Sequence, residues 1–219
     1  SLPLTMILSF LLALFLNQKF RGVGVMRLVV YLPVIIPVTI SGLLWRNFFD
    51  VEYGLANKIL TEVLNLPPSP FFSSAKTSMA TLIFMGLWSL GGSMILWLAA
   101  LRGVPEAQYD AAKIDGAGWW TRTIHITVPM CTPTILYNTI MGVINSLQMF
   151  GGVFALTGGT DGEAHSLLFY VMKVYYDAFG GTMEMAYACA ESWLLFVIIA
   201  VLTFLVFKTS KWVFYAEDY

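Results

Sequence analysis

The chain has 219 residues, of which 58% are hydrophobic and only 11% are charged. A soluble domain carries about a quarter of its residues as charges. This chain therefore has too few polar residues to cover a buried core, which excludes a soluble globular domain and predicts an integral membrane protein. The formal net charge of −1 also excludes a global field that would attract nucleic acid or acidic ligands.

Residues that commonly carry catalysis or metal binding are few and isolated from one another. Cys131 and Cys189 lie in apolar sequence without CxxC or metal-ligand spacing, so we expect buried free thiols. His125 and His165 stand without a spaced His, Cys or carboxylate partner. The sequence therefore predicts no enzymatic chemistry, no catalytic residue, no metal site and no cofactor on this chain.

Five apolar segments are predicted to cross the bilayer as helices. They cover residues 2–16, 28–49, 76–101, 129–150 and 185–207. The first is shorter than the roughly twenty residues that span the hydrocarbon layer, so we expect the chain to begin inside a helix, with sequence missing upstream. The second contains Pro33 and Pro37, which remove helical hydrogen bonds and predict a kink.

The connections between these segments contain further short elements. Apolar residues at helical spacing predict an interfacial helix from Leu55 to Leu64, which Pro67-Pro68-Ser69-Pro70 ends. The stretch Gly151–Ala164 is rich in glycine and polar residues, as in a connecting loop, and Leu167–Ala178 predicts a second short amphipathic helix.

The distribution of lysine and arginine predicts the orientation. Eight of these residues fall in the loops 17–27 and 102–128 and in the tail, namely Lys19, Arg21, Arg27, Arg102, Lys113, Arg122, Lys208 and Lys211. The opposite side holds Arg46, Lys58, Lys76 and Lys173, with acidic residues beside them. We therefore expect the first set to be cytoplasmic and the loops near 50–75 and 151–184 to lie outside.

The cytoplasmic segment 105–128 has the features of a short helix-turn-helix. Pro105 suits a first helical turn, and the carboxylates of Glu106 and Asp110 complement the start of a helix. Gly116 suits a helix end or tight bend, and a second helix from about Trp119 would lead into the fourth span. Its alanines and glycine would let another protein approach closely, although the same features occur in an ordinary connector.

In this segment, Asp110-Ala111-Ala112 is followed by Gly116 and then by Ile126-Thr127-Val128-Pro129. This pattern resembles the motif of bacterial ABC importer membrane subunits. That motif reads E-A-A-x-x-x-G, nine further residues, then I-x-L-P. Here Asp110-Ala111-Ala112, Gly116 and Ile126-Thr127-Val128-Pro129 stand at the same spacing, with Asp for Glu and Val for Leu. Three further stretches resemble the maltose-type carbohydrate permeases, namely Ala111 to Ala117, Tyr31-Leu32-Pro33 through Leu44-Trp45-Arg46, and Phe154-Ala155-Leu156-Thr157-Gly158-Gly159.

The resemblance implies an all-α, polytopic type I ABC importer transmembrane domain over residues 1–219, with five helices of a six-helix core. It implies that loop 105–128 docks into a cytoplasmic ATPase dimer, where Asp110 would meet a basic group. The coupling residues would be Glu106, Asp110, Ala111, Ala112, Gly116, Ile126 and Pro129. The sequence has no Walker A pattern, so ATP-Mg would bind the separate ATPase. A second homologous permease subunit, an extracytoplasmic solute-binding protein and the bacterial cytoplasmic membrane complete the expected setting.

Polar and aromatic residues in the spans are candidates for a sugar pathway. They are Trp88, Asn145, Ser146, Gln148, Met149 and Glu191. In the resemblance to the maltose permease, Ser146, Gln148 and Met149 match polar positions, and Met149 departs from that pattern. Each has an alternative: Asn and Ser bond between helices, Trp sits at membrane interfaces, and Glu191 near a helix end reaches water. The Gly158-Gly159 loop would either meet the binding protein or serve as a flexible connection.

Other functions stay open at this point. The chain would also fit an ABC permease for another solute such as glycerol phosphate, although phosphate would favour a basic residue in the pathway and only Arg46 is a candidate. An ion-coupled secondary transporter half would need paired intramembrane charges, and only Glu191 qualifies. A non-transporting scaffold would make the polar residues of the fourth span incidental.

Overall fold

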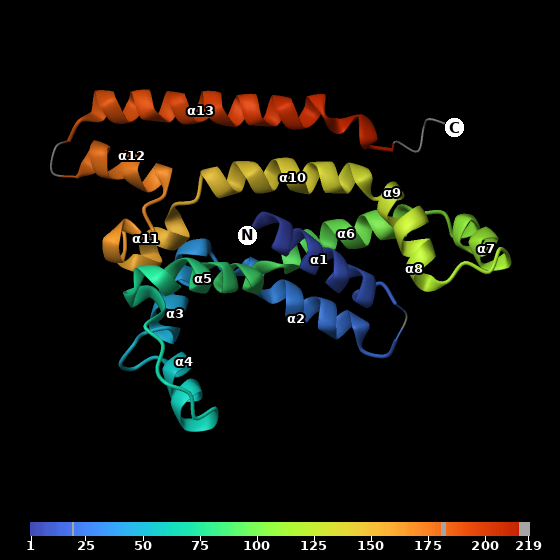
Figure 1. Cartoon of the computed structure of the whole chain (residues 1–219), viewed down its shortest axis with the longest axis horizontal. Helices are drawn as coiled ribbons and strands as arrows, with labels where there is room; N and C mark the ends of the chain where they lie inside the picture. The colour runs from blue at the N-terminus through green and yellow to red at the C-terminus, as the bar shows by residue number, and fades with distance from the viewer. Residues whose placement is uncertain (19, 181–182, 215–219) are drawn as a thin grey trace. The chain divides into compact units, whose positions relative to one another are not determined.

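The computed structural model describes residues 1–18, 20–180 and 183–214, which form helices joined by turns and loops, with no strand in these ranges (Figure 1). This confirms the predicted all-α class. The chain divides into two compact units. The first comprises Ser1–Pro33, Ser89–Val143 and Ala200–Tyr219, and the second comprises Val34–Trp88 and Ile144–Ile199. Lys19, one of the eight predicted cytoplasmic cations, lies outside the described residues.

The core of the first unit lies between α1 (Leu2–Leu16) and α6 (Gly91–Gly103), which pack against each other. Trp97 is its largest fully buried side chain, and its indole Nε1 donates a hydrogen bond of 3.0 Å to the buried Ser9 hydroxyl. The ring of Phe10 meets Trp97 edge-on at 5.1 Å. Trp97 is therefore a core residue whose polar atom is satisfied by α1.

Helix α2 (Val23–Ile35) is fastened to this core at two points. The guanidinium of Arg27 donates to Leu16 O at 2.6 and 3.2 Å, so it occupies a carbonyl that the end of α1 leaves free. Gly91 lies against the α2 backbone, because a Cβ there would be 2.3 Å from Val30 O. A glycine is required at this crossing.

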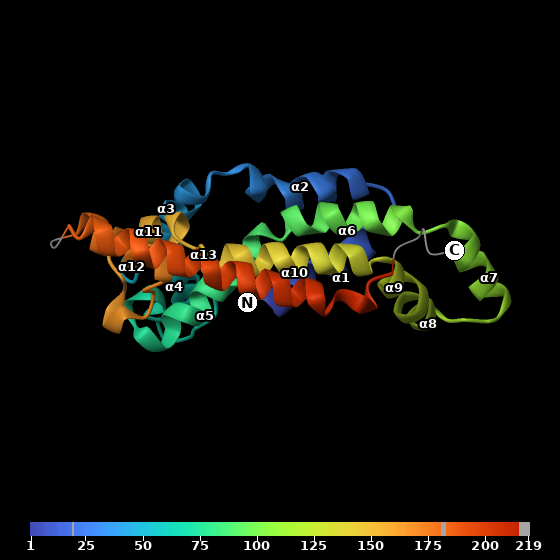
Figure 2. The same ribbon diagram turned by 90° about the horizontal axis from the view of Figure 1, so that it is seen from above.

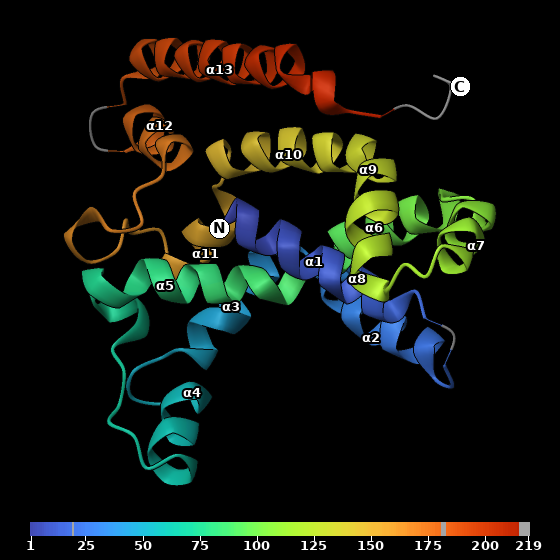
Figure 3. The same cartoon turned by 45° about the vertical axis from the view of Figure 1, so that its right-hand side comes forward.

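Most of the remaining helices of the first unit form the predicted cytoplasmic loop or follow it directly. They are α7 (Glu106–Ile114), α8 (Trp119–Arg122), a π-helical turn (Thr123–Thr127), α9 (Val128–Met130) and α10 (Thr132–Leu147), whose last residues belong to the second unit. Figures 2 and 3 both show α7 at one end of the first unit, joined to α8 by an extended stretch.

In the second unit, α3 (Val38–Phe48) packs closely on α11 (Gly151–Thr157). Both helices contribute a glycine to this contact: a Cβ on Gly42 would lie 2.4 Å from Gly152 O, and both glycines are buried. The nearby core consists of Leu82, Val153, Leu156, Leu167 and Met172. This core therefore joins residues that are seventy or more positions apart in the sequence.

Other elements of the second unit complete the connections. They are α4 (Leu55–Lys58), a π-helical turn (Ile59–Val63), 3₁₀ turns at Phe71–Ser73 and Glu163–His165, α5 (Ala75–Gly86) and α12 (Tyr170–Phe179). A 3₁₀ turn at Leu87–Ser89 lies at the boundary, with Ser89 in the first unit. The helical stretch 55–63 and α12 confirm the two short helices predicted from periodicity. The expectation of a loop over Gly151–Ala164 was wrong in its first half, since Gly151–Thr157 is helical and ends where Gly158 adopts φ 68°.

The membrane-crossing candidates fall on the predicted apolar segments. In the described ranges, α13 (Met185–Lys208) alone is one continuous helix of sufficient length and apolarity, with a mean hydropathy of 2.4. Three bent pairs, α2 with α3, Ala75–Ser89 with α6, and α10 with α11, pass the same test when each pair is taken as one broken span. Helix α1 is apolar but shorter. The described part of the chain thus contains up to four such spans by length and composition.

The predicted break in the second segment falls at Pro37. Helix α2 contains Pro33 and ends at Ile35, and α3 begins after Pro37, whose backbone has ψ 137°. The prediction for the cysteines was half wrong: both are free, but Cys131 is buried whereas Cys189 is exposed on α13. The sequence neighbours of Cys189 are apolar, but they lie on a helix that is largely exposed rather than buried against the rest of the chain.

Candidate functional site

The segment 105–128 folds as the predicted helix-turn-helix. Helix α7 begins at Glu106 after Pro105, and the second helical stretch begins at Trp119 and continues to Met130. A side-chain hydrogen bond of 2.9 Å between the hydroxyls of Tyr109 and Thr127 ties the two arms together. Because Thr127 is buried and Tyr109 half-buried, this bond fixes α7 against the start of the fourth apolar segment.

Gly116 forms the turn between the two arms. The Ala117 amide donates to Ala112 O at 2.9 Å and the Gly116 amide to Lys113 O at 3.1 Å, which is the Schellman arrangement of a helix end. Gly116 has φ 75°, and no heavy atom lies within 4 Å of a Cβ built there. The position thus demands a left-handed backbone, and crowding plays no part.

A π-helical turn precedes Pro129 in the second arm. Proline has no amide hydrogen and its ring crowds the carbonyl one turn earlier, so a regular α-helix is interrupted there. The wider turn at Thr123–Thr127 absorbs this interruption, and such turns often occur at functional positions. Ile126 and Pro129, the end of the sequence motif, are both half-buried on this arm.

The outer surface of α7 is exposed and combines charge with apolar side chains. Glu106, Asp110 and Ala111 are exposed and Ala112 is half-buried. The Asp110 carboxylate forms a 2.7 Å ion pair with Lys113, in which both side chains remain more than half exposed. Ile114 is 87% exposed at the end of the helix. Trp119 and Trp120 at the start of the second arm are exposed as well, and large apolar side chains left open in this way indicate a surface for another protein.

The predicted pathway residues of α10 are grouped at its C-terminal end. Asn145 and Ser146 are exposed, and Gln148 follows the helix and lines a cavity of about 360 Å³ together with Ser192 and Phe196 of α13. Met149 instead packs against the core around Val153. Polar groups therefore face outward here while the methionine anchors the turn into α11.

Trp88 lies apart from this group in the described contacts. It is 49% exposed and its ring meets Trp45 edge-on at 5.3 Å. It lines a second cavity of about 480 Å³ with Ser41, Asn47 and Tyr53. The structure therefore assigns Trp88 and Gln148 to different cavities of the second unit.

Glu191 has a partner that the sequence did not reveal. One carboxylate oxygen bonds the Lys173 ammonium, whose Nζ also bonds Asp177 at 2.6 Å, and the backbone oxygen of Glu191 accepts a 3.1 Å hydrogen bond from Tyr170. The side chain of Glu191 is only 12% exposed, and its other oxygen, Oε2, has no partner among the described residues. The spacing of Tyr170, Lys173 and Asp177 on one face of the predicted helix was the available signal.

The charged groups of this cluster shift the pKa values of one another. The hydrogen bonds that Lys173 donates to Asp177 and then to Glu191 raise its pKa. The same hydrogen bond from Lys173 lowers the pKa of Asp177. Both groups are therefore charged near neutral pH, and the cluster joins α12 to the first turns of α13.

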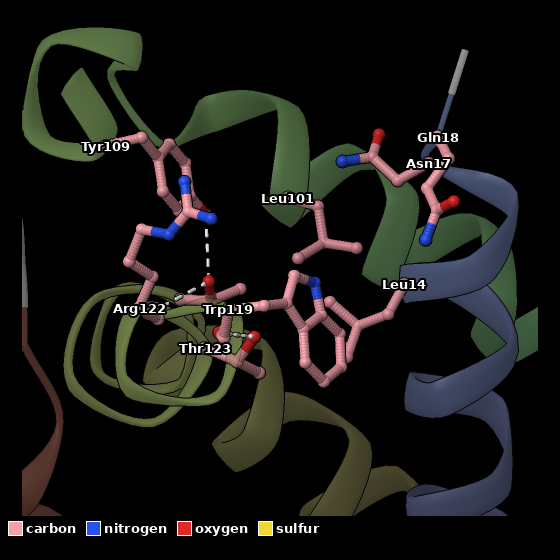
Figure 4. A pocket seen from close by; sticks show the side chains of 9 residues that line it. Leu14, Asn17, Gln18, Leu101, Tyr109, Trp119, Arg122 and Thr123 are labelled. Atoms are coloured by element: carbon pink, nitrogen blue, oxygen red, sulfur yellow. Dashed lines mark hydrogen bonds between the residues drawn. The ribbon is translucent and has the colours of Figure 1, made fainter. Parts of the chain in front are cut away.

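Two adjacent cavities lie near the predicted cytoplasmic ends of α1 and α6. They measure about 180 and 840 Å³ and share Asn17, Gln18, Leu101 and Tyr109. Figure 4 shows the smaller one, in which the Arg122 side chain extends toward Tyr109 and the Trp119 indole lies beside Leu14 and Leu101. These cavities could not be predicted from local sequence, because their residues come from three separate segments.

The histidines remain outside any metal site within the described ranges. His165 does have a carboxylate partner, Asp161, so the expectation that it stands alone was wrong. This pair is at the surface, with the imidazole 74% exposed. No group of three or more His, Cys, Asp or Glu side chains suited to a metal occurs among the described residues. Two partners four positions apart in the sequence make a local surface contact.

Comparisons of sequence connect the chain to proteins of known class. Residues 5–214 match the model of the family described as binding-protein-dependent transport system inner membrane component. The probable ABC transporter permease protein YesP of Bacillus subtilis (strain 168) is 32% identical over 97% of this chain and 69% of that protein. The lactose transport system permease protein LacF of Rhizobium radiobacter is 31% identical over 95% and 71%, respectively. The trehalose/maltose transport system permease protein MalF of Thermococcus litoralis is 30% identical over 96% and 70%.

Comparison of structures gives the same fold. A chain in the crystal structure of a bacterial alginate ABC transporter in complex with alginate pentasaccharide-bound periplasmic protein superposes with a TM-score of 0.85 and 23% identity, covering 96% of this chain and 73% of that one. A second structure, of a bacterial ABC transporter involved in alginate import, gives a TM-score of 0.81 at 22% identity, covering 93% and 71%.

Proposed function

The chain belongs to the family of binding-protein-dependent transport system inner membrane components, and from this premise we propose that it is the permease subunit of an ABC importer for a sugar or oligosaccharide. Relatives with about 30% identity over nearly the whole chain are named for lactose and for trehalose and maltose. The motif at Asp110–Pro129 and the family match lead to the same assignment. The subunit transports and has no catalytic role, since ATP is hydrolysed on a separate ATPase.

The observation that carries the mechanism is the exposed, internally fastened α7. A coupling element must present a surface to its partner and transmit force without bending at its base. Ile114, Ala111 and Asp110 are available on that surface, while the Tyr109–Thr127 bond holds the base. In the proposed mechanism an ATPase dimer grips α7, and its closure moves the second arm and the span that follows.

The coupling residues take distinct roles in this proposal. Glu106 and Asp110 meet basic groups of the ATPase, Asp110 by exchanging its surface partner Lys113, since exposed ion pairs contribute little and exchange easily. Ala111 and Ala112 keep the contact close. Gly116 makes the turn, and Ile126 and Pro129 anchor the second arm.

The substrate pathway is proposed along the ends of α5, α10 and α13. Asn145, Ser146 and Gln148 would bond sugar hydroxyls, and Trp88 offers a half-exposed aromatic face for a sugar ring. Met149 supports the turn that aims them. Glu191 would hold α12 to α13 through Lys173, with its free oxygen available to an incoming hydroxyl.

We further propose a bacterial cytoplasmic membrane as the location and three kinds of partner. These are an ATPase dimer inside, a second homologous permease subunit that completes the path, and a solute-binding protein outside. The alginate transporter of the same fold was crystallised with a substrate-bound periplasmic protein, which supports the last. A phosphorylated solute is less well supported, because the Arg46 guanidinium packs on Gly158, where a Cβ would lie only 2.5 Å from its Nη1.

The test is sugar-stimulated ATP hydrolysis by the complete importer in proteoliposomes. Gly116→Pro and Asp110→Lys should each reduce stimulation by the sugar-loaded binding protein while leaving the permease folded and membrane-inserted. Normal stimulation in both variants would exclude the coupling role of this loop. Stimulation by an amino acid or glycerol phosphate, but by no sugar, would exclude the proposed substrate class.

A further inference from the structure

The two adjacent cavities of the first unit carry a concentration of positive charge that the transport mechanism does not use. Arg21, Arg27 and Arg102 line the larger cavity and Arg122 lines the smaller one. Among the described residues that line either cavity, Glu106 is the single carboxylate. Four cations against one anion, on a chain whose net charge is −1, make this a local anion-attracting region.

These arginines are only partly satisfied by the protein. Arg27 is committed to Leu16 O at the end of α1. The Nε of Arg122 is buried and has no hydrogen-bond partner among the described residues. Arg21 and Arg102 are exposed, and neither bonds another described residue through its side chain. Guanidinium groups in this condition suit phosphate oxygens, which accept their parallel N–H donors.

The neutral side chains of the cavities suit the same ligand. Asn17 and Gln18 bring amide donors from the end of α1, and Figure 4 shows both on the same side of the cavity as Leu14. Leu14 and Leu101 supply the apolar wall. The site thus combines a charged rim, neutral donors and an apolar side, which is the composition that suits a headgroup together with the start of its acyl chains.

We propose that this pair of cavities binds the phosphate headgroup of an anionic phospholipid from the cytoplasmic leaflet. The neighbouring surface of α2 favours a lipid over a free phosphate, because Val25 and Val29 are each more than 60% exposed and follow shortly after Arg21. Basic pockets between membrane helices on the cytoplasmic side select anionic headgroups in this way. The inference rests on the proposed orientation of the chain and is independent of the transported solute.

The lipid would act next to the coupling loop. Tyr109 lines both cavities and bonds Thr127, and Glu106 borders the larger one. A bound headgroup would therefore contact the base of α7 and stiffen it against α1 and α6. Anionic lipid becomes a component of the coupling apparatus in this proposal.

The experiment measures lipid selectivity at Trp119 in the full chain, purified with its second permease subunit but without the ATPase, and reconstituted in phosphatidylcholine vesicles. Brominated phosphatidylglycerol or brominated phosphatidylcholine is titrated in, and the quenching lost in Trp119→Phe isolates the signal of this one indole. The main variant is Arg21→Gln/Arg102→Gln, chosen because both residues are exposed. The matched controls are Arg21→Lys/Arg102→Lys and Lys208→Gln, the latter a cation at the end of α13 outside both cavities.

Phosphatidylglycerol should quench Trp119 at a much lower mole fraction than phosphatidylcholine. Each arginine near an anionic surface contributes roughly fivefold, so the double glutamine variant should lose roughly twenty-five-fold of that preference. The lysine pair should keep most of it, and Lys208→Gln should change it less than about twofold. Arg122→Gln, which removes the unpartnered donor, gives a second loss that is independent of the exposed pair.

Four results would overturn the proposal. Equal quenching by the two lipids, or an unchanged preference in the double glutamine variant, would show that the arginines do not select a headgroup. Loss of the preference on adding millimolar inorganic phosphate would identify a soluble anion as the ligand. Displacement of phosphatidylglycerol by the ATPase subunit in proportion to its concentration would assign the cavities to the protein interface instead.

Discussion

Replacing Gly116 isolates the contribution of one backbone conformation to coupling. Its φ of 75° costs a residue with a Cβ about 1–2 kcal/mol. Because a Cβ there would meet no atom within 4 Å, no steric term is added for alanine. A penalty of this size lowers the population of the correct turn by roughly 5- to 30-fold. We therefore expect Gly116→Ala to raise, by that factor, the ATPase concentration needed for half-maximal coupling.

The order within a series distinguishes the backbone effect from any other. Asparagine tolerates the left-handed region and β-branched residues do not, so coupling should fall in the order Gly, Asn, Ala, Val. Helix propensity would instead place alanine first. The assay titrates purified ATPase against the reconstituted permease and records sugar-stimulated ATP hydrolysis. Gly103→Ala is the matched control, since Gly103 also has open space around it but no positive φ.

Two outcomes would refute this reasoning about Gly116. If alanine couples better than asparagine, the turn does not adopt the left-handed conformation in the working importer. If Gly103→Ala impairs coupling as much as Gly116→Ala, the effect belongs to glycine flexibility in general.

Three further predictions concern the base of the loop, the outer charge cluster and the α3–α11 contact. Tyr109→Phe removes one hydrogen bond worth about 1 kcal/mol. The backbone amides of α7 should therefore exchange hydrogen roughly fivefold faster, as measured by mass spectrometry. Unchanged exchange would show that this bond does not hold the base of α7. Lys173→Met should lower the melting temperature by an amount that stays constant through neutral pH. Because the pKa of Asp177 is lowered, its contribution to stability is lost only as the pH falls below its ordinary pKa of about 4. Because the pKa of Lys173 is raised, its contribution to stability is lost only as the pH rises above about 10. A melting-temperature difference that changes between pH 6 and 8 would contradict this reasoning. Gly42→Ala should destabilise the protein by about 1–3 kcal/mol in denaturant titrations, because its Cβ would meet Gly152 O, whereas Gly24→Ala in open space should be neutral or slightly stabilising.

Local patterns predicted the elements that local forces determine. The helix-turn-helix at 105–128 was predictable because its start, its left-handed glycine and its proline each leave a signature in the neighbouring residues. The short helices near Leu55 and Tyr170 were predictable from apolar periodicity. The break at Pro37 followed from the missing amide, although proline alone did not say that Pro33 would stay inside α2.

Features that depend on distant residues were missed. Lys173 was assigned to an outer loop and Glu191 to a span, and only the packing of α12 on α13 brings the two charges together. The helix α11 looked like a loop because its two glycines have low helix propensity. These glycines allow α11 to approach α3 closely. The resulting tertiary contact stabilises the helix, and no local sequence pattern reveals it.

The helical second arm of the loop, which includes the π-helical turn at Thr123–Thr127, fixes the direction in which its side chains point. Each residue in an α-helix advances the direction of its side chain by about 100° around the axis. Deleting one α-helical residue, Thr121 or Arg122, would therefore turn Trp119 and Trp120 by about that angle away from their present direction relative to α10. Adding one would swing them the other way. The number of residues between Gly116 and Pro129 thus sets the direction of the two tryptophans as well as the length of the arm. A partner whose surface fits this loop would no longer fit it after a single insertion or deletion.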